Sequence, residues 1–137
     1  MKNLTQWSRA VVAALTIILG TTAVSHGQMK VGEAAPLFVL KNSQGKGFDL
    51  AGMKEQPMLI LYFFDVASRP SQEGLLSLDK LAKKYKDAEL AVWGITRSGT
   101  SQVTQFLSQT KLGFPVLIDD GKVADAYAAR IILPTVC

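Results

Sequence analysis

The stretch that decides the fold is MLILYFFDVASRPS, residues 58–71. Its first half, residues 58–64, is a continuous apolar run without alternation, which is typical of a central strand buried on both faces of a sheet. The period then changes, because apolar residues recur at three- and four-residue steps from Leu75 to Tyr85. That spacing predicts an amphipathic helix over about residues 70–86. A buried strand followed at once by a helix indicates an α/β protein.

The alternation of strand and helix continues toward the C-terminus. LAVWGIT, residues 90–96, predicts a second buried strand, and residues 103–110 predict a helix that ends near Gly113 as its C′ glycine. Residues 115–118 predict a third strand, followed by a short helix over about 123–130. This order favours a three-layer α/β fold with a central, mostly parallel sheet and right-handed crossovers.

An N-terminal hairpin is expected before this core. Two short apolar runs, residues 37–40 and 47–50, flank the turn-prone sequence Asn-Ser-Gln-Gly at 42–45. Strand-like runs around such a cluster are typical of a β-hairpin.

The first 27 residues have the three zones of a secretory signal peptide. A basic start with Lys2 and Arg9 precedes the apolar run at 10–19, and small or polar residues follow as far as Gly27. We therefore expect residues 1–27 to be a signal peptide and residues 28–137 to be one domain in the periplasm or otherwise outside the cytoplasm. The alternative is an uncleaved anchor, the only case in which we expect membrane contact, although the run is short beside the roughly 20 residues of a bilayer span.

Composition excludes several classes of function. The chain of 137 residues carries a formal charge of +4, and the segment after the leader has 13 basic and 11 acidic residues, too weak and scattered an excess for nucleic-acid binding. With a single cysteine, Cys137, no intramolecular disulfide can form. The single histidine, His26, lies in the leader, so histidine metal sites and Ser-His or Cys-His catalysis are not expected. We expect no metal and no cofactor.

Several segments resemble the thioredoxin-like redoxins, which include the alkyl hydroperoxide reductase/thiol-specific antioxidant family and the TlpA-like disulfide reductases. VGEAAPLFVLKNSQGKGFDL, residues 31–50, is similar to their entry hairpin. GFPVLIDDGKVADAY, residues 113–127, is similar to their third strand and the helix after it, and Leu-Pro-Thr at 133–135 to their cis-proline segment. The resemblance covers about residues 31–137 and implies a thioredoxin-like fold in a family of oxidoreductases acting on disulfides or peroxides.

The family's Trp-Cys-x-x-Cys signature is replaced in this chain. The corresponding residues read Ala-Ser-Arg-Pro-Ser at 67–71, so Ser68 falls on the attacking cysteine and Ser71 on the resolving one. A serine forms no disulfide and needs a general base to become a nucleophile; Asp65 and Glu73 are the nearest carboxylates in the chain. We therefore assign no catalytic residue, and we expect both serines to cap the helix.

The other residues at the family's active-site positions predict a binding site for a partner. Arg69 and Pro70 stand between the two serines, and the resemblance sets Pro134, with Thr135 beside it, at the cis-proline that faces the active site in the family. We expect a groove beside Pro134 that takes a protein or peptide partner. Cys137 matches no active-site position, and it is either an ordinary strand residue or an exposed reactive thiol.

Three functions stay open at this point. The chain is a redoxin module that binds or assembles without dithiol catalysis, a thiol-disulfide oxidoreductase or peroxiredoxin-type enzyme as the family implies, or a structural fragment. In the family the cis-proline strand leads to a further strand and a closing helix, so we expect a domain truncated after the cis-proline segment and part of a longer protein. Alternatively, a partner supplies the missing strand. An endogenous protein with a mass near 14.8 kDa would contradict the longer parent.

Overall fold

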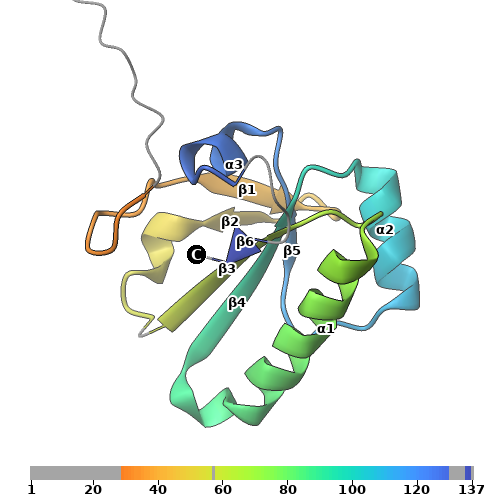
Figure 1. Cartoon of the computed structure of the whole chain (residues 1–137), viewed down its shortest axis with the longest axis horizontal. Coiled ribbons are helices and arrows are strands. Elements are labelled where there is room, and N and C mark those ends of the chain that lie inside the picture. The colour runs from red at the N-terminus through yellow and green to blue at the C-terminus, as the bar shows by residue number, and fades with distance from the viewer. Residues whose placement is uncertain (1–28, 57, 130–134, 137) are drawn as a thin grey trace, which may run out of the picture.

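The computed structural model describes residues 29–56, 58–129 and 135–136, and the described part forms a six-stranded mixed sheet with helices on both faces (Figure 1). In chain order the elements are β1 (Val39–Asn42), β2 (Gly47–Asp49), the 3-10 turn η1 (Leu50–Met53), β3 (Met58–Phe64), α1 (Arg69–Lys84), the 3-10 turn η2 (Lys86–Ala88), β4 (Leu90–Thr96), α2 (Thr100–Gln109), β5 (Val116–Ile118), α3 (Lys122–Ala126) and β6 (Thr135–Val136).

The strand order across the sheet is β2-β1-β5-β4-β3-β6. The three central strands β5, β4 and β3 are parallel, while β1, β2 and β6 pair antiparallel at the two sides. The parallel centre follows from helical crossovers, since α1 connects β3 to β4 and α2 connects β4 to β5. The predicted α/β class, the entry hairpin and the parallel centre are confirmed.

Two apolar clusters lie on opposite faces of the sheet, and they come from the alternation of side chains along β3. Tyr62 and Phe64 pack with Leu75 of α1 and Val103 of α2. Phe63, on the other face, packs in the second cluster, whose other buried members are Leu50, Leu61, Trp93, Ile95, Leu117, Val123, Ala124, Tyr127 and Ala129. The fold therefore has three layers, as predicted, with α1 and α2 on one face and α3 on the other.

The predicted end of the second helix is wrong. Helix α2 ends at Gln109, where Thr110 takes an extended conformation, so Gly113 is not its C′ residue. Instead the backbone N–H of Gly113 donates to Asp79 Oδ1 of α1 at 2.7 Å. Lys83 Nζ lies 2.5 Å from the other oxygen of the same buried carboxylate. Asp79 therefore ties the loop before β5 to α1.

This contact makes stability depend on pH. The hydrogen bond from Lys83, together with that from the Gly113 N–H, lowers the pKa of Asp79 below its ordinary value of 3.8. A lowered folded-state pKa contributes stability that is present above the unfolded-state pKa and is lost as pH falls through the folded-state one. We expect Asp79→Asn to lower the free energy of unfolding at pH 7 and the gap from wild type to shrink below about pH 4.

Urea denaturation of the two proteins at pH 7, 5 and 3 measures that gap. Asp87→Asn, at an exposed position in η2, is the matched control that should show little gap at any pH. A gap of the same size at pH 3 as at pH 7 would contradict the role given to Asp79.

The predicted signal peptide, residues 1–27, lies outside the described residues. Within the described ranges, no helix is both long and apolar enough to span a bilayer. The assignment of residues 28–137 to one domain stays a prediction.

Candidate functional site

The loop between β3 and α1 is a compact turn held by Asp65. The Asp65 side chain accepts from the Ala67 N–H at 2.9 Å, and its backbone carbonyl accepts from the Ser68 N–H at 3.1 Å. Ser68 is then extended, its hydroxyl accepts from the Ser71 N–H at 3.4 Å, and its carbonyl accepts from the Gln72 N–H at 3.0 Å. Ser68 is therefore the N-cap of α1, as predicted.

Ser71 does not act as a cap, contrary to the prediction. Its side chain is fully buried, with 0% exposure, and its hydroxyl has no hydrogen-bond partner among the residues that the structure describes. Its backbone carbonyl accepts from Tyr62 Oη at 3.1 Å, and burial raises the pKa of Tyr62. The position suits a small apolar or weakly polar group such as a thiol better than a hydroxyl, because an unpaired buried hydroxyl costs free energy.

The chemistry available at the start of α1 is limited. Among the described residues neither nearby carboxylate bonds to the Ser68 hydroxyl, because Asp65 Oδ1 faces Ala67 and Ser98 while Glu73 pairs with Arg69. Few helix N–H groups remain for an anion, since Pro70 has none and Ser68 takes that of Ser71. No group of three or more metal-ligating side chains occurs in the described part of the chain.

Removing the unpaired hydroxyl is expected to stabilise the protein. We expect Ser71→Ala to raise the free energy of unfolding by about 1 kcal/mol, since it relieves a buried unsatisfied group. Ser68→Ala, by contrast, should lower it by about 1 kcal/mol through loss of the N-cap. Chemical denaturation measures both variants, and a loss of stability in Ser71→Ala as large as in Ser68→Ala would contradict the distinction.

The other predicted site residues lie partly at the start of α1, partly in β6 and partly outside the described residues. Arg69 Nε lies 3.0 Å from Glu73 Oε1, and both side chains are well exposed, as is Pro70. Pro134 and Cys137 lie outside the described residues. The backbone of Thr135 is in β6, paired with Phe63 of β3, so β6 runs beside the strand that leads into the Ser68 turn.

A polar cleft that the sequence reasoning missed lies where β3 and β4 end. The two strands are parallel with Phe64 opposite Thr96, so Asp65 and Arg97 follow at neighbouring positions. Ser98 Oγ lies 3.0 Å from Thr96 Oγ1 and 3.4 Å from Asp65 Oδ1, which links the two strand ends. The cavity of about 500 Å³ is lined by Phe64, Asp65, Ala67, Arg97, Ser98 and Gln102. Polar residues directly after two neighbouring parallel strands were the signal that could have found it.

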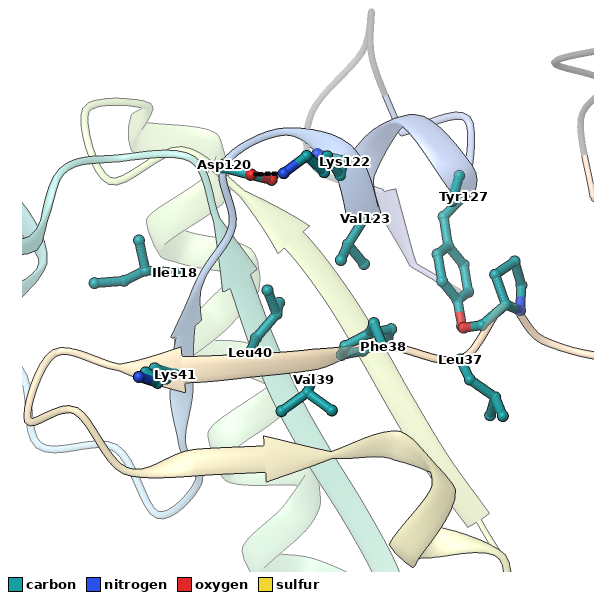
Figure 2. A pocket seen from close by; sticks show the side chains of 12 residues that line it. Leu37, Phe38, Val39, Leu40, Lys41, Ile118, Asp120, Lys122, Val123 and Tyr127 are labelled. Carbon is teal, nitrogen blue, oxygen red and sulfur yellow. Dashed lines mark hydrogen bonds and ion pairs between the residues drawn. The ribbon is translucent and has the colours of Figure 1, made fainter. Parts of the chain in front are cut away.

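A second cavity, of about 530 Å³, lies between β1 and α3 (Figure 2). Its lining is mainly apolar, with Phe38, Leu40 and Val123 among the contributing side chains. Tyr127 Oη closes one end by donating to the Pro36 carbonyl at 2.9 Å. None of the predicted site residues that the structure describes lines this groove, so it is separate from the turn at Ser68.

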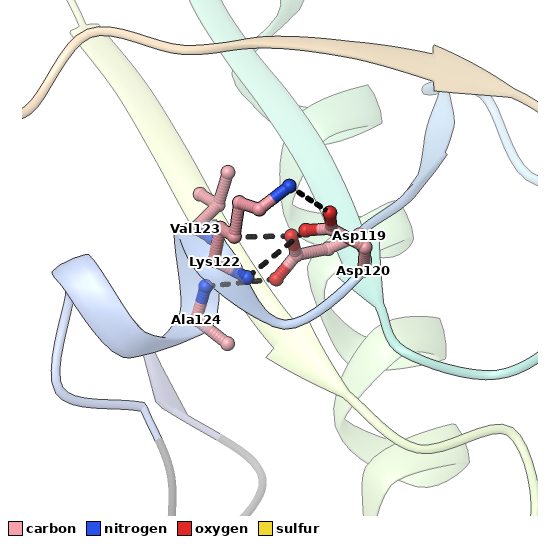
Figure 3. Close-up of polar contacts among 5 residues, drawn as sticks. All are labelled: Asp119, Asp120, Lys122, Val123 and Ala124. Carbon is pink, nitrogen blue, oxygen red and sulfur yellow. Dashed lines mark hydrogen bonds and ion pairs between the residues drawn. The ribbon is translucent and has the colours of Figure 1, made fainter.

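The acidic turn before α3 has a structural role (Figure 3). The buried Asp119 carboxylate accepts from the N–H groups of Val123 at 3.1 Å and Ala124 at 2.8 Å. Asp120 forms an exposed pair with Lys122, whose Nζ lies 2.6 Å from Asp120 Oδ2. The Asp119 carboxylate therefore anchors the start of α3.

The amino-acid sequence is similar to those of known proteins. Residues 31–136 match the pattern of the AhpC/TSA family. The chain is 30% identical over 110 residues to the thiol-disulfide oxidoreductase ResA of Bacillus thuringiensis subsp. konkukian, covering 79% of this chain and 62% of that protein. It is 29% identical over 111 residues to a chloroplastic peroxiredoxin Q of Oryza sativa subsp. japonica, covering 80% of this chain and 50% of that protein.

The fold has a matching neighbour among solved structures. The crystal structure of a putative thiol:disulfide interchange protein DsbE from Chlorobium tepidum superposes with a TM-score of 0.72 at 23% identity, covering 80% of this chain and 77% of that one. This neighbour shows the thioredoxin-like fold. The chain spans half to three fifths of the length of the two curated relatives.

Proposed function

The chain belongs to the AhpC/TSA family, and on that premise we propose that it is a redoxin-fold binding or assembly module that works outside the cytoplasm without dithiol catalysis. The observation that carries the proposal is which residues stand at the start of α1. Ser68 stands there as a helix cap and Ser71 as a fully buried hydroxyl, where the family resemblance expects the attacking and resolving cysteines. Neither group can form the mixed disulfide on which thiol-disulfide exchange depends.

The binding role uses the surface around that turn. Arg69 and Pro70 are exposed at the first turn of α1, and β6 pairs with β3 next to it. These features support a groove beside Pro134 and Thr135 that takes an extended segment of a protein or peptide partner.

The location outside the cytoplasm rests on the leader. Residues 1–27 have the basic start, short apolar run and small-residue end of a secretory signal, and we propose that they direct export to the periplasm or an equivalent compartment. If the leader stays uncleaved, the same segment would hold the module at the membrane.

The second candidate is an enzyme of the kind that the relatives' names describe, a thiol-disulfide oxidoreductase or a peroxiredoxin-type antioxidant. The family assignment favours it, and any thiol chemistry would have to use Cys137, the single cysteine in the sequence. Activity that disappears in Cys137→Ser is the result that this candidate requires.

The binding role is tested by capture from an extracytoplasmic extract with the wild-type chain and with Pro134→Ala. We expect Pro134→Ala to lose specific proteins that the wild type retains. Identical captured sets would remove the support for a groove at Pro134.

A further inference from the structure

The Arg97 side chain has an unusual position at the end of β4. It makes no hydrogen bond or ion pair with any residue that the structure describes, and its guanidinium lies along the backbone of Gly121. A methyl group on Gly121 would stand 3.3 Å from Arg97 Nε and 3.4 Å from Cζ, and Gly121 has a φ of +105°, which favours glycine. The guanidinium therefore rests on a glycine surface with its donors unused.

This guanidinium lines the 500 Å³ cleft at the carboxyl ends of β3 and β4. Gln102 accepts the Gly99 N–H with its Oε1 at 3.1 Å, which leaves its amide NH₂ as a donor. The hydrogen bonds of the Asp65 carboxylate with other described residues use Oδ1, which leaves Oδ2 as an acceptor toward them.

The charges of the cleft select among anions. Among the residues that the structure describes, one guanidinium and one carboxylate line it, so this lining has no net charge and Asp65 opposes a dianion such as phosphate. A monoanionic carboxylate with a neighbouring amide N–H fits better, because Arg97 can hold the carboxylate with two parallel hydrogen bonds while Asp65 accepts the N–H.

We propose that this cleft is a carboxylate-binding subsite for a peptide, with Arg97 as the group that recognises it. The proposal deepens the binding role proposed above and rests on it, since it specifies the chemistry of the partner segment. The carboxylate comes either from an acidic side chain or from a free C-terminus, and both sources present the same group to Arg97.

Three synthetic pentapeptides distinguish these sources. The first is acetylated and amidated with a central glutamate, the second carries glutamine instead, and the third is the glutamine peptide with a free C-terminal carboxylate. Each is titrated into the ¹⁵N-labelled full chain, with inorganic phosphate as a fourth probe, while amide signals near Asp65 and Arg97 are followed. We expect at least one carboxylate peptide to bind more tightly than the neutral peptide and than phosphate.

Substitutions of Arg97 test its role in binding the carboxylate. Arg97→Gln should weaken binding of the carboxylate peptide about tenfold, and Arg97→Lys should recover part of the loss because it keeps the charge without the two-pronged geometry. Lys80→Gln, an equal change of charge at an exposed site on α1, should leave the affinity unchanged. An unchanged spectrum away from the cleft verifies that each variant is folded.

Equal affinity of wild type and Arg97→Gln, or equal binding of the neutral peptide, would overturn the subsite. These outcomes would leave the wider binding role standing if partner capture still depended on Pro134. Conversely, thiol-disulfide turnover by the native chain would refute the proposed function while leaving a measured Arg97-dependent affinity intact.

Discussion

Gly74→Ala is expected to lower the free energy of unfolding by about 3 kcal/mol. Gly74 lies inside α1, and a methyl group there would stand 2.1 Å from Tyr62 Oη and 3.1 Å from Tyr62 Cζ. Tyr62 is only 2% exposed and its hydroxyl is bonded to the Ser71 carbonyl, so the ring has little room to move away. Alanine is the better helix former by about 1 kcal/mol, so helix propensity alone predicts the opposite sign.

A double-mutant cycle with Tyr62→Phe separates the two effects. Loss of the hydroxyl alone should cost about 1 kcal/mol, since one hydrogen bond is lost. In the phenylalanine background the closest clash is gone, and Gly74→Ala should then cost about 1 kcal/mol or less. Denaturation of the four proteins gives the coupling energy, and a Gly74→Ala protein as stable as wild type would contradict the close approach of α1 to Tyr62.

Ser68→Cys is expected to create a reactive thiolate. The side chain caps a 16-residue helix and accepts the Ser71 N–H, so a thiolate in its place would be stabilised by that N–H and by the helix dipole. We expect the pKa of the new thiol to fall from about 8.5 to about 7 or below. The rate of alkylation by iodoacetamide at pH 6 to 9 measures it.

The matched control places the same thiol in the middle of the helix. Ser77 is exposed on α1 and far from its N-terminus, so Ser77→Cys should titrate as an ordinary thiol. Both variants are made with Cys137→Ser so that one thiol is present. Identical pH profiles would show that the start of α1 no longer provides the environment of a redoxin cysteine.

The sequence predicted the buried core of the sheet well. The apolar runs at 58–64 and 90–96 match β3 and β4 residue for residue, because a strand covered on both faces has no polar interruption. The end of α2 was harder to predict. A glycine that follows a helix as its C′ residue and a glycine that donates to a distant carboxylate look alike in the local sequence. Only the contact between Gly113 and Asp79, 34 residues apart in the chain, distinguishes them.

The candidate site was only partly predictable for the same reason. The cap role of Ser68 is local and could be predicted from the residue type, whereas the burial of Ser71 depends on how α1 packs on β3. The position of Arg97 in the cleft is not visible in the sequence, because it depends on the register of β3 against β4 and on the conformation of Gly121.

The proposed loss of dithiol chemistry can be tested by measuring insulin-disulfide reduction and peroxide turnover for the full native chain, beside Cys137→Ser and the Ser68→Cys/Ser71→Cys pair. We predict that the native chain and Cys137→Ser both stay at the background rate. Turnover by the native chain that disappears in Cys137→Ser would contradict the account.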